Sequence, residues 1–264
     1  MRIPCLAAVT AFLLTSFAVP AVAADVDFSG MVDLRNCSGS VVRTPSAQPT
    51  DPALVMSNGH CLKFLAPGEV VVDQPSSRTF TLLDAAGKTL APLPVAKVAY
   101  ATMTDTDVSF YRLHATYAEL EALGGKALEL SAAHPKARTD IRVVSGLWKR
   151  VYSCRVDGFV HRLREADWTW TDSIRYTAPC HTIAGTSGSP IVDVSTGKVI
   201  GVNNTVNENG ESCTQNNPCE VNSAGEVTVR EGIAYGQQTY QAVACIGAAS
   251  VITLTAPGCT LPRP

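Results

Sequence analysis

The sequence has no block of Lys or Arg, no low-complexity segment and no extreme charge, since its 264 residues carry a formal net charge of −2. Proteins that bind nucleic acid or anionic membranes concentrate positive charge on one face, so we expect neither partner. Beyond the N-terminus no apolar run is suited to span a bilayer, because the best candidate, residues 242–256, is interrupted by Gly247, Ser250 and two threonines. The cysteines after Cys5 show no Cys-x-x-Cys spacing, so a zinc site is not indicated.

Residues 1–24 have the pattern of a secretory signal peptide. Arg2 supplies the positive start, residues 6–19 form an apolar region too short to cross a bilayer, and residues 21–23 offer an Ala-x-Ala cleavage site. We therefore expect signal removal near Ala23 or Ala24 and a secreted, extracellular mature chain. An even number of cysteines in such a chain predicts disulfides, although their pairing is left open. These cysteines are Cys37, Cys61, Cys154, Cys180, Cys213, Cys219, Cys245 and Cys259.

Short alternating or β-branched runs, separated by Pro, Gly, Asp and Asn, predict strands along most of the chain. They fall into two groups, which predict an all-β fold of two six-stranded antiparallel barrels packed around a cleft. We expect the first group at 26–32, 40–43, 70–72, 78–83, 96–101 and 108–113, the second at 141–147, 150–156, 158–163, 173–177, 191–194, 198–203 and 232–237, and short helices at 117–130 and 240–246. The expected organisation is a first barrel at 25–123, a crossover at 124–139, a second barrel at 140–244 and a tail at 245–264.

A Gly-x-Ser-Gly motif, formed by Gly185, Ser187 and Gly188, precedes the β-rich run 191–194. Glycines permit backbone angles that a Cβ forbids, so the serine can lie on a tight turn with its hydroxyl exposed and its own N–H turned toward a cleft. This is how a nucleophile is presented beside an oxyanion hole. Small-residue turns of the same kind also serve only to join two strands.

A candidate base and a candidate carboxylate precede this serine in the chain. His60 lies in an Asn-Gly-His-Cys sequence after an apolar run, and Asp107 leads into an alternating strand. An imidazole can take the proton of a serine hydroxyl, and a buried aspartate can hold that imidazole in the required tautomer. Without the other motifs, the favoured interpretation of His60 is a structural histidine beside a disulfide. The remaining histidines, His114, His134, His161 and His181, have no comparable context.

These three motifs resemble those of the chymotrypsin-like (trypsin-fold) serine endopeptidases, which carry them in the order His, Asp, Ser. The resemblance implies peptide-bond hydrolysis through an acyl-enzyme on Ser187, with His60 as the base and Asp107 as the orienting carboxylate. The backbone N–H groups of Gly185 and Ser187 would form the oxyanion hole. Asp105 is the rival carboxylate, but a threonine follows it where the family has an apolar residue. We expect a monomer that needs no cofactor or metal and acts on protein or peptide substrates.

The same resemblance implies one disulfide, because family members bridge a cysteine before the histidine to the cysteine directly after it. That bond is Cys37–Cys61, and it would hold His60 in place. Cys213 with Cys219 would then close a small polar loop, and Cys245 with Cys259 would tie down the tail. Cys154 and Cys180 are left as the fourth pair.

The chain departs from the trypsins around the serine. Thr186 replaces the aspartate that pairs with a new N-terminus in trypsin-type zymogens, and Ser189 gives a Gly-x-Ser-Gly-Ser-Pro sequence close to the glutamyl endopeptidase-like branch. By ungapped counting, His181 and Thr182 fall on the wall or floor of the specificity pocket. Asn203 takes the place of the histidine that meets the substrate carboxylate in the glutamyl branch, and lies on a strand expected to pair with an extended substrate.

Two other functions compete with that of a peptidase. A non-catalytic secreted binding protein of the same fold would be expected to have lost a triad residue, and all three are present. An esterase of unrelated fold would place its histidine after its serine, and no histidine follows Ser187. The sequence leaves the residue preference at the cleaved bond open.

Overall fold

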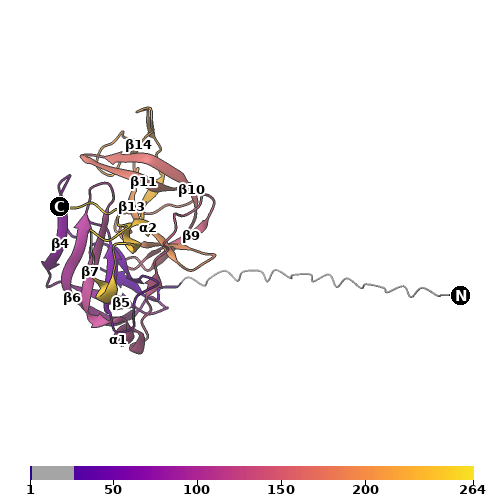
Figure 1. Cartoon of the computed structure of the whole chain (residues 1–264). Helices are drawn as coiled ribbons and strands as arrows, with labels where there is room; N and C mark the ends of the chain where they lie inside the picture. The colour runs from indigo at the N-terminus through magenta and orange to yellow at the C-terminus, as the bar shows by residue number, and fades with distance from the viewer. Residues whose placement is uncertain (2–26) are drawn as a thin grey trace.

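The computed structural model describes Met1 and residues 27–264. The predicted signal peptide and its cleavage site lie outside the described residues. Two closed β-barrels make up most of the remainder, so the predicted fold class is confirmed. In Figure 1 the first barrel fills the lower half of the molecule and the second barrel the upper half.

The first barrel is a ring of six antiparallel strands in the order β1, β5, β6, β7, β3, β2, which the β1–β2 pairing closes. Its bounds are β1 (Met31–Asp33), β2 (Ser38–Arg43), β3 (Pro52–Ser57), β5 (Thr79–Leu83), β6 (Thr89–Thr102) and β7 (Val108–Thr116). Outside the ring, β4 (Val70–Pro75) pairs with β6, and β8 (Leu128–Glu129) pairs in parallel with β2.

The second barrel is also a closed antiparallel ring, in the order β9, β10, β11, β16, β13, β12. Its bounds are β9 (Asp140–Ser145), β10 (Arg150–Glu165), β11 (Trp168–Tyr176), β12 (Pro190–Asp193), β13 (Val199–Val206) and β16 (Ala234–Gln238). A hairpin of β14 (Cys219–Val221) and β15 (Val227–Val229) extends the sheet from β10. This hairpin was not predicted, because each of its strands has only three residues.

The two barrels share their apolar cores. One cluster combines first-barrel residues such as Tyr111 with Trp170 and Tyr235 of the second barrel, and another combines Tyr100 and Phe110 with Val202 and other second-barrel residues. Burial of such large side chains between the barrels contributes about 1.5–3 kcal/mol for each fully buried one. The cleft between the barrels therefore has rigid walls on both sides.

Helix is scarce and shorter than the sequence predicted. The helix expected at 117–130 is only α1 (Tyr117–Ala122), which a capping box of Thr116 and Glu119 opens. It ends where Gly124 adopts a φ of +87°, and β8 occupies part of the expected crossover. Near the C-terminus lie α2 (Tyr240–Val243) and the short 3-10 helix η1 (Ala248–Ser250). No described helix has the length and apolar character needed to cross a membrane.

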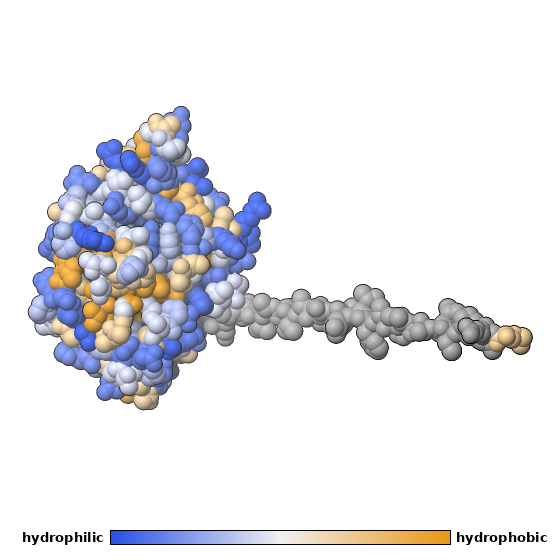
Figure 2. Space-filling view, viewed as in Figure 1, coloured by the Kyte–Doolittle hydropathy of each residue, from blue (hydrophilic) through white to orange (hydrophobic). Residues whose placement is uncertain are grey.

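All four expected disulfides are present: Cys37–Cys61, Cys154–Cys180, Cys213–Cys219 and Cys245–Cys259. The last one holds the C-terminal tail, which returns to the first barrel, where the Tyr100 hydroxyl donates to the Pro262 carbonyl at 3.0 Å. Figure 2 shows a mostly polar face on which apolar residues gather over the lower half, where β4, β6 and β7 lie.

Candidate active site

His60 and Asp107 approach each other from two paired strands of the first barrel, since His60 follows β3 and Asp107 directly precedes β7. His60 Nδ1 lies 2.7 Å from Asp107 Oδ2, and the His60 backbone N–H donates to Oδ1 at 3.1 Å. The carboxylate is fully buried, whereas 20% of the His60 side chain is exposed. Burial lowers the pKa of His60, but the charge and hydrogen bond of Asp107, together with the charge of Glu165, leave it raised above 6.5. Asp105, the rival carboxylate, is exposed.

Buried hydrogen bonds fix the backbone on both sides of this pair. The Asn58 side-chain amide donates to the Asp107 carbonyl at 2.8 Å, and the Ser109 hydroxyl donates to the Asn58 carbonyl at 2.7 Å. Position 59 requires glycine because the Thr102 backbone lies close to it. A Cβ at this position would lie 2.1 Å from the Thr102 carbonyl oxygen. The Asn-Gly-His sequence therefore has a structural reason at each of its positions.

The oxyanion turn, which we define as residues 183–187, precedes β12. The Thr186 N–H donates to the Ile183 carbonyl at 3.0 Å, and Gly185 stands at the third position of this turn with a φ of +83°. That combination is typical of a type II turn, which favours glycine at this position. Within residues 27–264, neither the Gly185 nor the Ser187 N–H donates a hydrogen bond. Both amides are thus free to donate to a negative oxygen.

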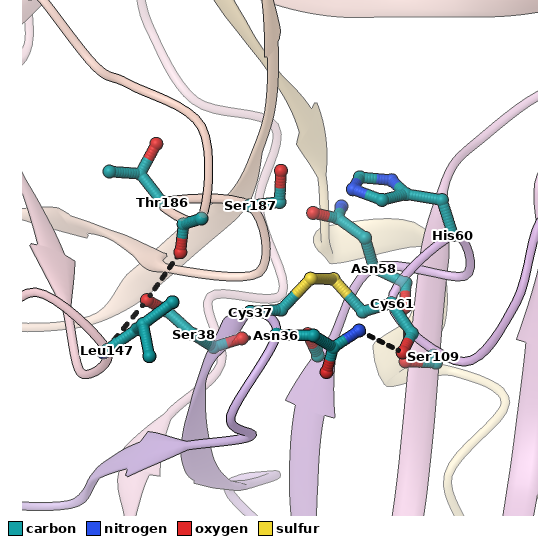
Figure 3. Close-up of a disulfide and its surroundings, with 12 residues drawn as sticks. Asn36, Cys37, Ser38, Asn58, His60, Cys61, Ser109, Leu147, Thr186 and Ser187 are labelled. Atoms are coloured by element: carbon teal, nitrogen blue, oxygen red, sulfur yellow. Dashed lines mark hydrogen bonds between the residues drawn. A yellow bond between two sulfur atoms is a disulfide. The ribbon is translucent and has the colours of Figure 1, made fainter.

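The Ser187 hydroxyl donates to the Asn204 carbonyl at 3.2 Å. The described residues show no hydrogen bond between Ser187 and His60. In Figure 3 the two side chains lie on the same side of the Cys37–Cys61 disulfide. Catalytic hydrogen bonds are often long or misaligned before substrate binds. The absence of this bond is therefore compatible with a catalytic pair, and both side chains line the same cleft.

Trp148 anchors the peptide that carries the Gly185 amide. Its indole N–H donates to the Ala184 carbonyl at 2.8 Å. The C=O and N–H of a trans peptide point in opposite directions, so this bond holds the Gly185 N–H away from Trp148. The Ser38 hydroxyl, visible in Figure 3, donates to the Gly185 carbonyl at 3.2 Å.

Asn203 and Thr186 form a neutral chain behind the oxyanion turn. The Asn203 side-chain amide donates to the Thr186 hydroxyl at 3.1 Å, and that hydroxyl donates to the Ile183 carbonyl at 2.5 Å. Both side chains are buried. These hydrogen bonds hold the turn from behind through neutral groups.

One cleft of about 260 Å3 between the barrels is lined by His60, Asp107, Asn203 and the oxyanion turn, residues 183–187. Of the sequence-predicted specificity residues, Thr182 and Asn203 line it, whereas His181 is exposed and does not. Cys37 and Cys61 lie beside His60, but their mutual disulfide leaves neither thiolate to hold a metal.

Three residues of the site were missed in the sequence analysis. Ser38 and Trp148 act on backbone groups distant in sequence, and Glu165 reaches the cleft from the end of β10. Ser38 directly follows a cysteine of the expected disulfide, which was a usable signal. Nothing in the local sequence of Trp148 or Glu165 distinguishes either residue from other surface positions.

Comparison with known proteins gives one family. A model of the trypsin-like peptidase domain matches residues 37–202. No curated protein matches the chain. Among solved structures, the MamO protease domain from Magnetospirillum magneticum is 13% identical with a TM-score of 0.48, covering 80% of this chain and 92% of its own. The active form of the Rv3671c protease from M. tuberculosis is 16% identical with a TM-score of 0.48, covering 96% and 97%. A Glu endopeptidase in complex with MPD is 14% identical with a TM-score of 0.44, covering 80% and 85%.

Proposed function

Because the chain belongs to the trypsin-like peptidase domain family, we propose that it is a secreted serine endopeptidase that cleaves peptide bonds through an acyl-enzyme on Ser187. The observation that carries this proposal is a single cleft lined by His60, its buried partner Asp107, and Ser187 with two free backbone amides nearby. Four disulfides support an extracellular location, since such bonds persist in oxidising compartments.

In the proposed mechanism the Ser187 hydroxyl turns from the Asn204 carbonyl toward the free Nε2 of His60. The imidazole takes the hydroxyl proton as the oxygen attacks the substrate carbonyl, and later gives it to the leaving amine. Asp107 stabilises the imidazolium while it exists. The N–H groups of Gly185 and Ser187 donate to the oxygen that becomes negative, and removal of one such donor typically costs about 10² to 10³ in rate.

The proposal does not include a glutamyl preference. An acidic substrate side chain requires a cationic group in its pocket, and none of the described residues that line the cleft is Lys or Arg. The side-chain amide of Asn203, which occupies the place of the glutamyl-branch histidine, is already bonded to Thr186. We expect an extended substrate to pair with the end of β13, beyond the residues that pair with β12.

The test is covalent labelling of the purified mature protein by a fluorophosphonate, read by intact mass, beside Ser187→Ala and Ser189→Ala. Ser189 is the matched control, because it lies in the same motif, is buried and makes no side-chain hydrogen bond within the described residues. We expect wild type and Ser189→Ala to gain one label and Ser187→Ala none, with at least a thousandfold loss of peptidase rate in Ser187→Ala. An unlabelled but folded wild type would favour a non-catalytic binding protein.

A further inference from the structure

Glu165, the last residue of β10, is a buried carboxylate that the proposed chemistry does not use. It is 7% exposed and lines the cleft. Its Oε1 accepts the Asn216 backbone N–H at 2.8 Å, whereas Oε2 has no hydrogen-bond partner within residues 27–264. A buried carboxylate oxygen without a partner is costly, so the site favours a ligand that supplies a donor or a positive charge.

The charge of the cleft points to the same kind of ligand. Its lining carries the carboxylates of Asp107, Glu165 and the exposed Glu208, and no Lys or Arg among the described residues. Asp107 is committed to His60, which leaves Glu165 as the buried charge available to a ligand. Burial raises the pKa of Glu165. The Thr205 side chain, the Asn216 N–H and the charge of His60 lower this pKa, and the charge of Asp107 raises it. A bound cation would stabilise the ionised form.

Aromatic side chains form the rest of this part of the cleft. Phe64 is 60% exposed, and its ring centroid lies 6.2 Å from His60 and 5.7 Å from Trp168. The indole N–H of Trp168 donates to the Leu65 carbonyl at 2.8 Å, which fixes that ring. Aromatic faces attract cations and also accept the aliphatic stem of Lys or Arg.

The position of Glu165 relates this pocket to the reaction. Its carboxylate lies near Thr205, at the end of the strand expected to pair with substrate, and its charge acts on His60. A side chain that reaches Glu165 therefore belongs to the part of the peptide that lies along β13, close to the bond being cleaved.

We propose that Glu165 is a specificity-determining residue and that the pocket of Glu165, Phe64 and Trp168 takes a Lys or Arg side chain of the peptide substrate. The inference rests on the proposed peptidase function. The charge of the Glu165 carboxylate attracts the guanidinium or ammonium group at the end of this pocket, and the stem lies along the aromatic rings.

The experiment is a positional scan of fluorogenic peptides with wild type, Glu165→Gln and the control Asp167→Asn. Gln keeps an oxygen for the Asn216 N–H, and melting temperatures check that each variant folds. Wild type is expected to prefer Lys or Arg at one position along β13, and Glu165→Gln to lose about 10- to 100-fold in kcat/KM on that peptide. Its rate on a peptide with norleucine at the same position should change less than about threefold. Asp167→Asn, whose exposed carboxylate is two residues from Glu165 and does not line the cleft, should retain the preference.

Two results overturn the inference: a wild-type preference for acidic or apolar residues at every position, or an equal loss on both peptides in Glu165→Gln. A failure of the peptidase function itself is recognised separately, by absence of fluorophosphonate labelling in the folded wild type. In that case binding of the lysine and norleucine peptides is measured by fluorescence polarisation. A preference for lysine that Glu165→Gln abolishes supports the pocket without catalysis, and equal affinity of the two peptides refutes it.

Discussion

Gly185→Ala is the most direct perturbation of the proposed oxyanion hole. No change of side chain deletes a backbone N–H, so the substitution instead disturbs the turn that orients this N–H. Gly185 has a φ of +83°, a region that costs an L-residue with a Cβ about 1–2 kcal/mol. The new Cβ would also lie 2.8 Å from Trp148 Nε1 and 2.9 Å from Leu147 Cδ2. The first contact presses on the side chain that holds the Ala184 carbonyl, so the peptide is expected to rotate and withdraw its N–H from the cleft.

The expected result is a loss of about 10² to 10³ in kcat, the usual size of one missing oxyanion donor, with KM changed much less. Gly225→Ala is the matched control. Gly225 has a φ of +84° in the β14–β15 turn, and a Cβ there would meet nothing within 4 Å. It should therefore show a similar backbone penalty in melting temperature while retaining wild-type kcat.

The assay is steady-state hydrolysis of a fluorogenic peptide, together with the rate of fluorophosphonate labelling and the melting temperature of each variant. Wild-type kcat and labelling rate in a folded Gly185→Ala would refute the assignment of the Gly185 amide to the oxyanion hole. A comparable activity loss in Gly225→Ala would show that the effect comes from general destabilisation rather than from the turn.

Three further predictions concern the same framework. Trp148→Phe removes one hydrogen bond to the Ala184 carbonyl, which is worth about 1 kcal/mol. We therefore expect kcat to fall about fivefold with KM nearly constant. A change in KM alone would contradict the role of Trp148 in positioning the turn. The pKa of His60 is raised and its neutral form is the base, so kcat/KM should fall with decreasing pH at a midpoint above 6.5; a pH-rate profile that is flat down to pH 6 would argue against His60. Removal of the Cys37–Cys61 bond by paired Ala substitutions should lower the free energy of unfolding by about 2–5 kcal/mol, measured by denaturant titration, and an unchanged midpoint would oppose it.

Local patterns in the sequence predicted most of the framework. Alternating runs bounded by turn residues predicted the majority of the barrel strands, because period-two burial is a property of the strand itself. The resemblance supplied the Cys37–Cys61 pair and the three motifs whose side chains share the cleft. The helix expected at 117–130 was too long, because Gly124 and Gly125 follow Leu123 and end the helix there.

What the sequence could not determine depends on contacts between distant segments. Trp148 and the Ala184 carbonyl are 36 residues apart, and the Ser38 hydroxyl reaches Gly185 across 147 residues. Such partners are backbone groups, which every residue has, so no side-chain pattern identifies them. Glu165 looks like an ordinary charged strand end in the sequence, and distant residues such as Asn216, whose N–H hydrogen bond it accepts, enclose it as a buried carboxylate in the cleft. The sequence thus determined which chemical groups are available, and the packing of the two barrels decided which of them face one another and how much water they retain.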